Sequence, residues 1–194
     1  MSGPDPDLTY PDAVVGPTQG GRPVVVLTGP PGAELAQTGR SLGLLLGLPV
    51  RDTDTEVELA AGMPVPDIFV DRGEPAFRML EQAAVALGLS EHRGVLVLGS
   101  GAVMDPLTEA ALTGHTVAFL DVEIADAARR LGFNRERPVA IGSPRAQWLK
   151  LMTARRPVYS RLATVTVRTA GLEPEQVARD VAAALGLAPA AGQR

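Results

Sequence analysis

The sequence predicts a three-layer α/β/α fold around a five-stranded parallel sheet, and three observations support this fold class. Short β-branched or aliphatic runs alternate with longer segments of helical periodicity, which is typical of consecutive β-α-β units. The 194 residues, 45% of them hydrophobic, suffice for one domain with an aliphatic core. Glycines and carboxylates follow several apolar runs, at the sheet edge where α/β proteins bind ligands. We therefore expect one domain with a ligand site at the carboxyl ends of its strands.

The expected elements follow one another with short connections. Apolar, β-branched runs predict strands at 24–28, 49–52, 94–99, 115–121 and 163–168. Helical periodicity predicts helices at 34–47, 53–61, 74–88, 105–113, 123–131, 146–154 and 174–186. The last of these begins at Pro174, a residue suited to a first helical turn. Residues 1–22 and 188–194 show no period, so we expect disordered tails around a domain at 23–187.

Composition narrows the classes of ligand and partner. A net charge of −4 and a pI near 5.2 give no general attraction for nucleic acid or an anionic membrane, and we expect neither as a partner. Lys150 is the only lysine, so arginines must hold any anionic ligand. Cysteine is absent and His92 and His115 are isolated, which disfavours a metal centre of protein ligands alone. Because the sequence lacks a long apolar run and a signal-peptide pattern, we expect a cytoplasmic protein.

The most informative segment follows the first expected strand and has the outline of a phosphate-binding loop. Such a loop reads G-x-x-x-x-G-K-[ST] and uses backbone N–H groups, a lysine and a Mg²⁺-binding hydroxyl. Its last three positions here hold Glu34, Leu35 and Ala36. At an effective dielectric of about 20, one unit charge at roughly 5 Å is worth about 3 kcal/mol, so we expect weakened nucleotide binding. The helix N-terminus still favours an anion, and the direction of the Glu34 carboxylate stays open. The candidate nucleotide-binding residues of this degenerate loop are Gly29, Gly32, Ala33, Glu34, Leu35 and Ala36.

Carboxylates and arginines near the other strand ends each have two interpretations on their residues alone. Asp52 and Asp54 either divide two functional roles between them, one of which is that of a base, or simply cap a helix. Arg78 and Glu81, three residues apart, form either a braced carboxylate-binding arginine or an ordinary surface ion pair. Segment 99–101 is either a loop that approaches a ligand closely or a turn that needs glycine for its dihedral angles.

Taken together, these ordered motifs resemble the shikimate kinase family, whose members have a P-loop kinase fold. The similarity extends from about residue 22 to residue 187. The motifs that carry it are DTD at 52–54, GEPAFRMLE at 73–81, GSG at 99–101, NRERP at 134–138 and RRPVY at 155–159. The middle residue of the glycine loop, Ser100, departs from the family's three glycines.

The resemblance implies how the substrate is bound. Asp54 accepts hydrogen bonds from the substrate hydroxyl and acts as its base. Arg78, braced by Glu81, and Arg155 hold the substrate carboxylate. The implied substrate-binding residues are Asp54, Arg78, Gly99, Ser100, Gly101 and Arg155.

The resemblance also implies roles on the nucleotide side. Asp52 orients the water shell of Mg²⁺ when the metal is present. Arg130 stacks on adenine, and Arg137 is the catalytic cation of a lid at about 132–147 that closes over the phosphates. Arginines in an exposed loop are otherwise a solvated surface, so this assignment depends on the resemblance.

The altered loop makes a pseudokinase our first hypothesis. Such a protein keeps a site for shikimate or a similar polyhydroxy carboxylate, performs little or no phosphoryl transfer and needs no cofactor, so the chain leans away from being an enzyme. It would act as a sensor or as the partner of another pathway enzyme. One alternative is an active shikimate kinase, which uses Mg·ATP to form 3-phosphoshikimate in aromatic amino acid biosynthesis. Another is an interaction module with a vestigial pocket.

Overall fold

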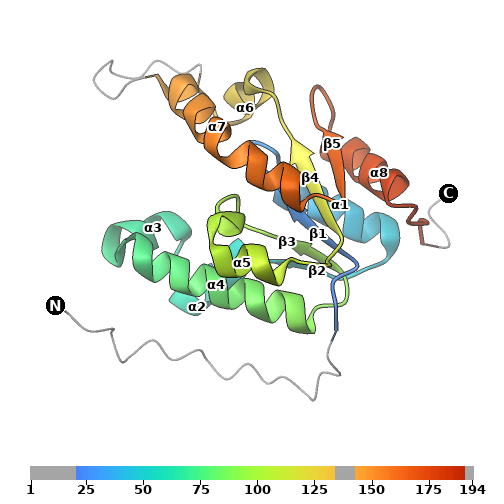
Figure 1. Ribbon diagram of the computed structural model, residues 1–194, viewed down its shortest axis with the longest axis horizontal. Coiled ribbons are helices and arrows are strands. Elements are labelled where there is room, and N and C mark those ends of the chain that lie inside the picture. The colour runs from blue at the N-terminus through green and yellow to red at the C-terminus, as the bar shows by residue number, and fades with distance from the viewer. Residues whose placement is uncertain (1–20, 134–142, 191–194) are drawn as a thin grey trace.

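The predicted five-stranded parallel sheet is confirmed, with strand order β2-β3-β1-β4-β5 (Figure 1). A computed structural model describes residues 21–133 and 143–190 of the chain. The central strand of the sheet pairs with both neighbours, and its Val26 lies opposite Leu96 on one side and Val117 on the other. Val26 is fully buried, as expected for a strand covered on both faces. The strands are β1 (Val25–Thr28), β2 (Val50–Asp52), β3 (Val95–Val97), β4 (Val117–Asp121) and β5 (Val165–Arg168).

Helices connect the strands and cover both faces of the sheet. Helix α1 follows β1, three helices lie between β2 and β3, and the remaining helices occupy the second half of the chain. They are α1 (Leu35–Leu46), α2 (Thr53–Ala61), α3 (Val65–Asp71), α4 (Gly73–Glu91), α5 (Pro106–Ala111), α6 (Ile124–Arg130), α7 (Pro144–Leu162) and α8 (Pro174–Ala184), with a 3₁₀ turn, η1 (Ala102–Met104), before α5. Within the described part of the chain, no helix is long and apolar enough to cross a membrane.

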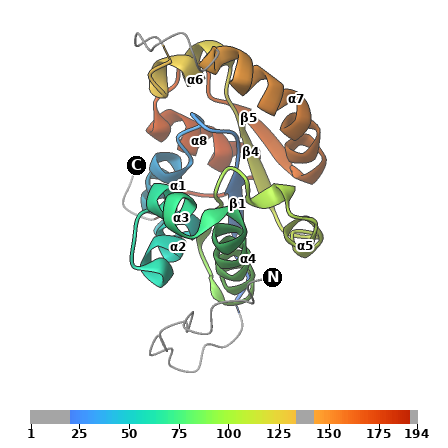
Figure 2. The same cartoon turned by 90° about the vertical axis from the view of Figure 1, so that its left-hand side faces the viewer.

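Adjacent residues of β3 show how the three layers form. A Cβ on Gly39 of α1 would overlap the Val97 side chain, and a Cβ on Gly88 of α4 would lie 2.7 Å from Leu96 Cδ1. Because consecutive strand residues point to opposite faces, α1 and α4 pack on opposite sides of the sheet. Figure 2 shows α8 beside α1, with α5 and α7 on the other side. The two glycines thus allow close packing of a helix on each face.

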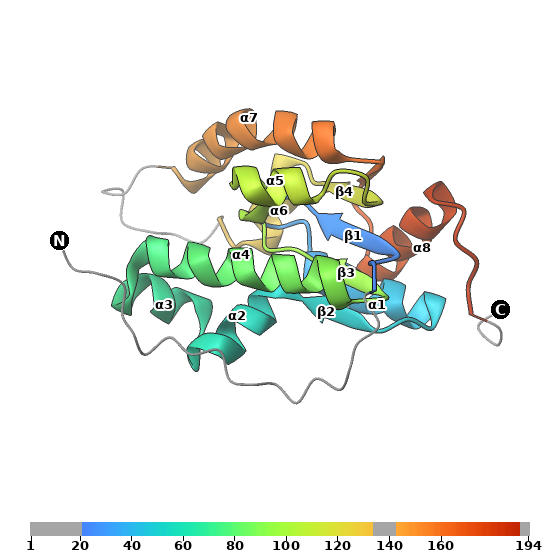
Figure 3. The same ribbon diagram turned by 60° about the horizontal axis from the view of Figure 1, so that its bottom comes forward.

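A smaller lobe extends from one edge of the sheet, where α2, α3 and the first half of α4 pack together (Figure 3). Its separate core contains the fully buried Val57 and Ile68 and the ring of Phe77, which is 5% exposed. Phe69 adds a tilted ring contact to Phe77, with centroids 4.5 Å apart. Through this packing the lobe places the start of α4 beside the ends of β2 and β3, where the carboxylates lie.

Three local features differ from the predicted elements. Helix α3 and the turn η1 were not expected, and α7 extends through Pro157 to Leu162 although the sequence indicated an end near residue 154. Within the predicted C-terminal tail, the amide of Ala190 donates to the carbonyl oxygen of Leu45 in α1 at 2.9 Å. Most of the predicted tails, and residues 134–142 of the predicted lid, lie outside the described residues, so the predicted domain bounds stay predictions.

Candidate functional site

The loop after β1 enters helix α1 through two residues with positive φ. Gly32 has φ of 89° and Glu34 has φ of 57°, and the helix α1 begins at the next residue. The N-terminus of α1 has no side-chain cap. Because the first N–H groups of a helix have no partner within it, this end is suited to an anion.

The Glu34 carboxylate is paired with a cation. Its Oε2 lies 2.7 Å from Nε of Arg130 at the end of α6, and the Arg130 side chain is only 11% exposed. The negative charge that the sequence placed in the loop is therefore compensated within the site. The carboxylate is thus directed toward Arg130, and Glu34 also lines the cavity beside the loop.

Two carboxylates stand at the exit of β2. Asp52 is the N-cap of α2, and its Oδ1 accepts a hydrogen bond of 3.0 Å from the Asp54 amide. Partial burial raises the pKa of Asp52 and opposes the lowering by its backbone hydrogen bonds. Asp54 keeps accessible surface, yet the protein around it and the nearby charges of Asp52 and Glu81 raise its pKa from 3.8 to about 6. A carboxylate with such a pKa is suited to general-base work near neutral pH.

Helix α4 carries an arginine between two acids. Arg78 Nη1 donates to Glu81 Oε2 at 2.6 Å, and its Nη2 donates to Glu74 at 3.0 Å. The Glu81 side chain is only 4% exposed, and burial raises its pKa while the Arg78 hydrogen bond opposes that rise. The guanidinium also lies 5.1 Å from the ring centre of Phe77. Arg78 is therefore fixed in direction, with 35% of its side chain exposed for a ligand.

The loop after β3 explains why its glycines are needed. A Cβ on Gly99 would overlap Asp54 Oδ1, and a Cβ on Gly101 would lie 2.8 Å from Arg78 Nη1. The Gly99 amide donates to Oγ1 of the fully buried Thr53 at 2.9 Å. The two glycines thus let Asp54 and Arg78 approach the backbone, and neither glycine has a positive φ that would require it for its dihedral angles. The close approach of a ligand to segment 99–101 stays a prediction.

Helix α7 supplies the last predicted substrate contact. Arg155 Nη1 donates to the Ser100 carbonyl oxygen at 3.3 Å, and Tyr159 donates its hydroxyl to the same oxygen at 2.5 Å. Tyr159 is fully buried and stacks on Phe119, with ring centres 5.1 Å apart. The part of α7 beyond Pro157 is therefore held by packing and by a hydrogen bond.

A cavity of about 250 Å³ joins the carboxylates to the loop at 29–34, which we call the phosphate loop after its predicted role. It is lined by residues of this loop, including Gly32, by Leu35 at the start of α1, and by Asp52, Asp54 and Ser100. Mg²⁺ in phosphoryl-transfer sites takes one or two carboxylates plus phosphate and water oxygens, and the Asp52 and Asp54 carboxylates in this cavity fit that requirement. Among residues 21–133 and 143–190, no group of three or more His, Cys, Asp and Glu residues is placed to hold a metal by itself.

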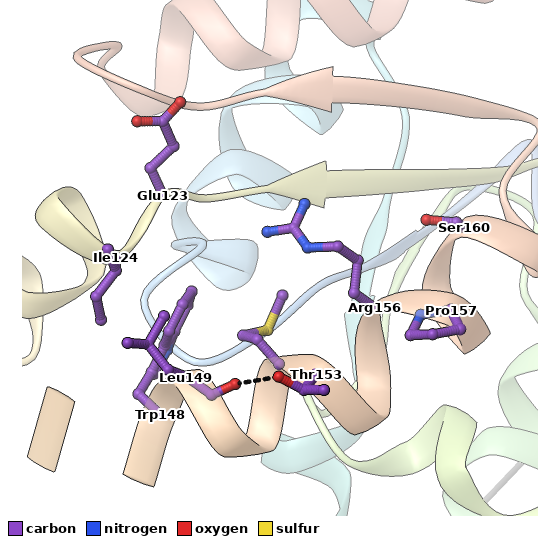
Figure 4. A pocket seen from close by; sticks show the side chains of 9 residues that line it. Glu123, Ile124, Trp148, Leu149, Thr153, Arg156, Pro157 and Ser160 are labelled. Carbon is purple, nitrogen blue, oxygen red and sulfur yellow. Dashed lines mark hydrogen bonds between the residues drawn. The ribbon is translucent and has the colours of Figure 1, made fainter. Parts of the chain in front are cut away.

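A second cavity, of about 590 Å³, lies between the end of β4 and α7 (Figure 4). It is lined by Trp148, Met152 and Arg156, among others, and lacks the predicted substrate residues. Arg156 forms an ion pair with Asp121 at 2.5 Å, so its charge is compensated at the strand end. The larger cavity therefore lies apart from the predicted acid–base and carboxylate-binding groups.

The structure brings most of the predicted site residues together but does not place all of them. Arg137 lies outside the described residues, so its lid role stays a prediction. Sequence reasoning missed the roles of Thr53, Tyr159 and Trp148, whose Nε1 donates to the Pro31 carbonyl oxygen at 3.0 Å. Tyr159 belongs to the RRPVY motif, and Trp148 is the only tryptophan, but neither feature indicates a backbone partner.

Comparison with protein families and curated proteins gives consistent matches. The family model described as shikimate kinase matches residues 32–186. The shikimate kinase of Frankia casuarinae is 47% identical over 175 residues, which cover 90% of this chain and 78% of that protein. The shikimate kinase of Salinispora arenicola is 51% identical over 163 residues, which cover 84% of this chain and 98% of that protein.

Solved structures agree with these matches. Shikimate kinase from Acinetobacter baumannii, in complex with shikimate, has a TM-score of 0.73 and 27% identity, covering 83% of this chain and 90% of that one. The shikimate kinase structure from Bacteroides thetaiotaomicron also gives a TM-score of 0.73, at 24% identity, with coverage of 86% and 99%. The second likeness supports the fold alone.

These matches contradict the pseudokinase hypothesis. Relatives between 42% and 51% identical, over most of this chain, are shikimate kinases, which favours the active kinase over both the pseudokinase and the vestigial interaction module. Part of the expected loss of nucleotide affinity came from the charge of Glu34, and the ion pair with Arg130 compensates that charge. Leu35 and Ala36 still stand where a phosphate-binding loop has its lysine and hydroxyl.

Proposed function

Because this chain belongs to the shikimate kinase family, we propose that it transfers the γ-phosphate of ATP to a hydroxyl group of shikimate, forming 3-phosphoshikimate. The observation that carries the proposal is the shared cavity in which Asp54 meets the phosphate loop. An acceptor hydroxyl beside Asp54 would lie next to the phosphates of a bound nucleotide. Phosphoryl transfer depends mainly on such positioning and on charge stabilisation.

The carboxylate of shikimate would be held by arginines from two helices. Arg78 is directed by Glu74 and Glu81, and the direction of Arg155 is set by its bond to the Ser100 carbonyl. A planar guanidinium can donate two parallel hydrogen bonds to a carboxylate, which fixes the orientation of the ligand as well as its affinity. With the carboxylate held in this way, the substrate hydroxyls would be presented to the wall that carries Asp54.

Asp54 would act as the general base. Its pKa of about 6 leaves it ionised at neutral pH and still able to accept a proton as the hydroxyl attacks. The proton would move from the substrate hydroxyl to a carboxylate oxygen of Asp54, and the neighbouring Asp52 and Glu81 favour its retention there. The close approach of Gly99 keeps bulky side chains away from this carboxylate.

The nucleotide phosphates would be held by backbone N–H groups at the start of α1 and by arginines, since Leu35 and Ala36 offer no polar side chain. Asp52, with Asp54 beside it, would hold the water shell of Mg²⁺. When bound, the metal would neutralise charge on the phosphate oxygens. By resemblance to the family, Arg137 would be the cation that closes over the phosphates, and Arg130 would lie on the side of the adenine.

A direct assay tests the proposal. The purified chain is incubated with shikimate and Mg·ATP, and phosphoshikimate is followed by phosphorus NMR together with release of ADP. We expect shikimate-dependent product at a turnover number within the range of about 1 to 100 per second that is usual for kinases. A control without shikimate separates transfer from simple ATP hydrolysis. If shikimate binds in a calorimetric titration but no phosphoshikimate appears, the proposed activity is wrong.

We further propose the setting that this reaction implies, a place in aromatic amino acid biosynthesis. A cytoplasmic location and contact with another enzyme of that pathway are predictions that accompany the function. Co-purification with an enzyme that produces shikimate or consumes its phosphate would support the second, and a chain that elutes alone at cellular concentration would argue against it.

A further inference from the structure

Glu34 has a backbone conformation that glutamate rarely adopts. Its φ of 57° and ψ of 42° lie in the left-handed region, and among residues 21–133 and 143–190 it is the one non-glycine residue with positive φ. The conformation is disfavoured because the Cβ approaches the carbonyl oxygen of the same residue. Such strain persists only where the surroundings hold it, and it occurs often at ligand sites. The ion pair with Arg130 is the side-chain contact that holds Glu34 in this conformation.

Arg130 holds the Glu34 carboxylate and also bonds to two backbone segments. Its Nε pairs with Glu34 at 2.7 Å, its Nη1 donates to the Gly32 carbonyl at 3.0 Å, and its Nη2 donates to the Leu172 carbonyl at 2.9 Å. Longer contacts of 3.4 Å reach the hydroxyl and carbonyl oxygens of Thr169. One nearly buried guanidinium thus joins the phosphate loop to the turn at 169–172.

Other contacts confirm that the loop is tied to this side of the molecule. A Cβ on Gly32 would lie 3.0 Å from Ala127 Cα, so the loop packs directly on α6. On α7, the indole of Trp148 donates to Pro31 at 3.0 Å and is 5% exposed. The loop carbonyls therefore face α6 and α7, which leaves the N–H groups at the start of α1 free of these tethers.

We infer that Glu34 is a positioning residue for the nucleotide, because it fixes Arg130 and through it the relative placement of the phosphate loop and the turn at 169–172. The inference rests on the proposed kinase function and deepens it. A guanidinium with five donors in one plane needs an acceptor on each edge to keep a single orientation, and Glu34 supplies the acceptor at Nε. In the same contact, the positive charge of Arg130 compensates the carboxylate, which therefore repels the nucleotide phosphates less.

The opposite role for Glu34 makes an opposite prediction. If the carboxylate only repelled phosphate, its neutralisation would strengthen nucleotide binding, because an unfavourable charge would disappear. If it positions Arg130, neutralisation weakens nucleotide binding, because the Nε contact loses its charge and the guanidinium is held less firmly. The variant Glu34→Gln keeps the size and an acceptor oxygen, so it separates these two roles with little change in shape.

The experiment measures binding of Mg·ATP, and of ADP without metal, by calorimetry for the native chain and for Glu34→Gln, together with KM for both substrates and kcat. We expect the dissociation constant and KM for the nucleotide to rise about fivefold to tenfold, which corresponds to about 1 to 1.4 kcal/mol. KM for shikimate and kcat should change less than twofold, a separation that a general loss of structure does not produce. Glu34→Gly removes the carboxylate, so nucleotide binding should weaken. It also relieves the backbone strain, so the melting temperature should not fall.

Arg129→Gln is the matched control, since Arg129 is the preceding residue of α6, is ion-paired with Asp126 at 2.8 Å and is 64% exposed. It should leave nucleotide binding unchanged. Unchanged or tighter nucleotide binding by Glu34→Gln, in a native chain that turns over, overturns the inference alone. Nucleotide binding by the native chain without turnover overturns the proposed function alone, while the binding comparison still decides the role of Glu34. A native chain that binds no nucleotide overturns both.

Discussion

The buried hydroxyl of Tyr159 donates a 2.5 Å hydrogen bond to the carbonyl oxygen of Ser100, and this contact ties α7 to the loop after β3. The same oxygen accepts from Arg155 at 3.3 Å. Because Arg155 and Tyr159 lie one helical turn apart, both point toward this carbonyl from one face of α7. The backbone at Ser100 is thus fixed from outside the loop, between the two glycines that border Asp54 and Arg78.

Removal of this hydroxyl should loosen the loop with little loss of packing. We expect Tyr159→Phe to lower the free energy of unfolding by about 1 kcal/mol, the usual contribution of one hydrogen bond, and to raise KM for shikimate severalfold. Urea unfolding and steady-state kinetics measure the two effects. Thr153→Val, which removes a hydroxyl from the exposed side of the same helix, should change neither. If the stability and KM of Tyr159→Phe match the native chain, the contact has no role in holding the loop.

The paired acids around Arg78 predict that its shape matters as well as its charge. Arg78→Lys keeps one positive charge but cannot bond to Glu74 and Glu81 and also grip a carboxylate with two parallel hydrogen bonds. We expect KM for shikimate to rise about tenfold to a hundredfold, in line with the loss of one or two charged hydrogen bonds. KM for ATP should change little. Arg161→Lys alters a similar but exposed ion pair with Glu109 and serves as control; an equal effect of both substitutions would contradict a substrate role for Arg78.

The assignment of Asp54 as base predicts a particular pH profile. The base must be ionised to accept a proton, so kcat/KM for shikimate should rise with pH and level off above a pKa of about 6. Asp54→Asn should reduce kcat by about a hundredfold to ten-thousandfold and abolish that rising limb. Initial rates between pH 5 and pH 8 test both statements. A native profile that is flat across this range would exclude Asp54 as the titrating base.

The same raised pKa predicts how stability depends on pH. Between pH 3.8 and about 6, the folded chain holds a proton on Asp54 that the unfolded chain has released. Stability therefore falls as pH rises through this window, and the ionised carboxylate destabilises the fold above it. After allowance for screening by solvent at this partly exposed group, Asp54→Asn should be about 1 kcal/mol more stable than the native chain at pH 7.5.

Urea unfolding at pH 4.5 and pH 7.5 measures this difference, which should be smaller at the lower pH. Asp180→Asn, on the exposed side of α8, provides the comparison. A gain for Asp54→Asn that is equal at both values would show that ionisation of this carboxylate does not cause it.

The sequence predicted the strands well because parallel strands covered on both faces must be apolar and β-branched, as Val25 and Val26 are. It missed α3, whose seven residues are too few for a visible period and include a proline near the start. It also ended α7 early, because Pro157 usually breaks a helix. The contacts of Tyr159 beyond that proline stabilise the last turns, and such long-range contacts have no local signal.

The site was also predicted only in part, because local motifs are visible in the sequence and long-range contacts are not. Asp54, Arg78 and Gly99 lie in local motifs, so their proximity followed from the topology of a parallel sheet. The partner of Glu34 could not be found in this way, since Arg130 is distant in sequence, at the end of α6, and the sequence does not distinguish it from the other arginines. Charge was counted by position along the chain, whereas its effect depends on the ion pair that only the fold creates.

The compensated charge of Glu34 leads to a prediction about the two positions that follow it. If backbone N–H groups and arginines already hold the phosphates, a lysine and a hydroxyl at Leu35 and Ala36 add little. We expect Leu35→Lys combined with Ala36→Ser to raise kcat/KM for ATP by less than about tenfold, which is below 1.4 kcal/mol of transition-state stabilisation. Steady-state kinetics with saturating shikimate measure this change, with Leu35→Gln as the uncharged comparison. A gain of a hundredfold or more would mean that positive charge is the limiting feature of the native loop, and that the remaining groups do not hold the phosphates as proposed.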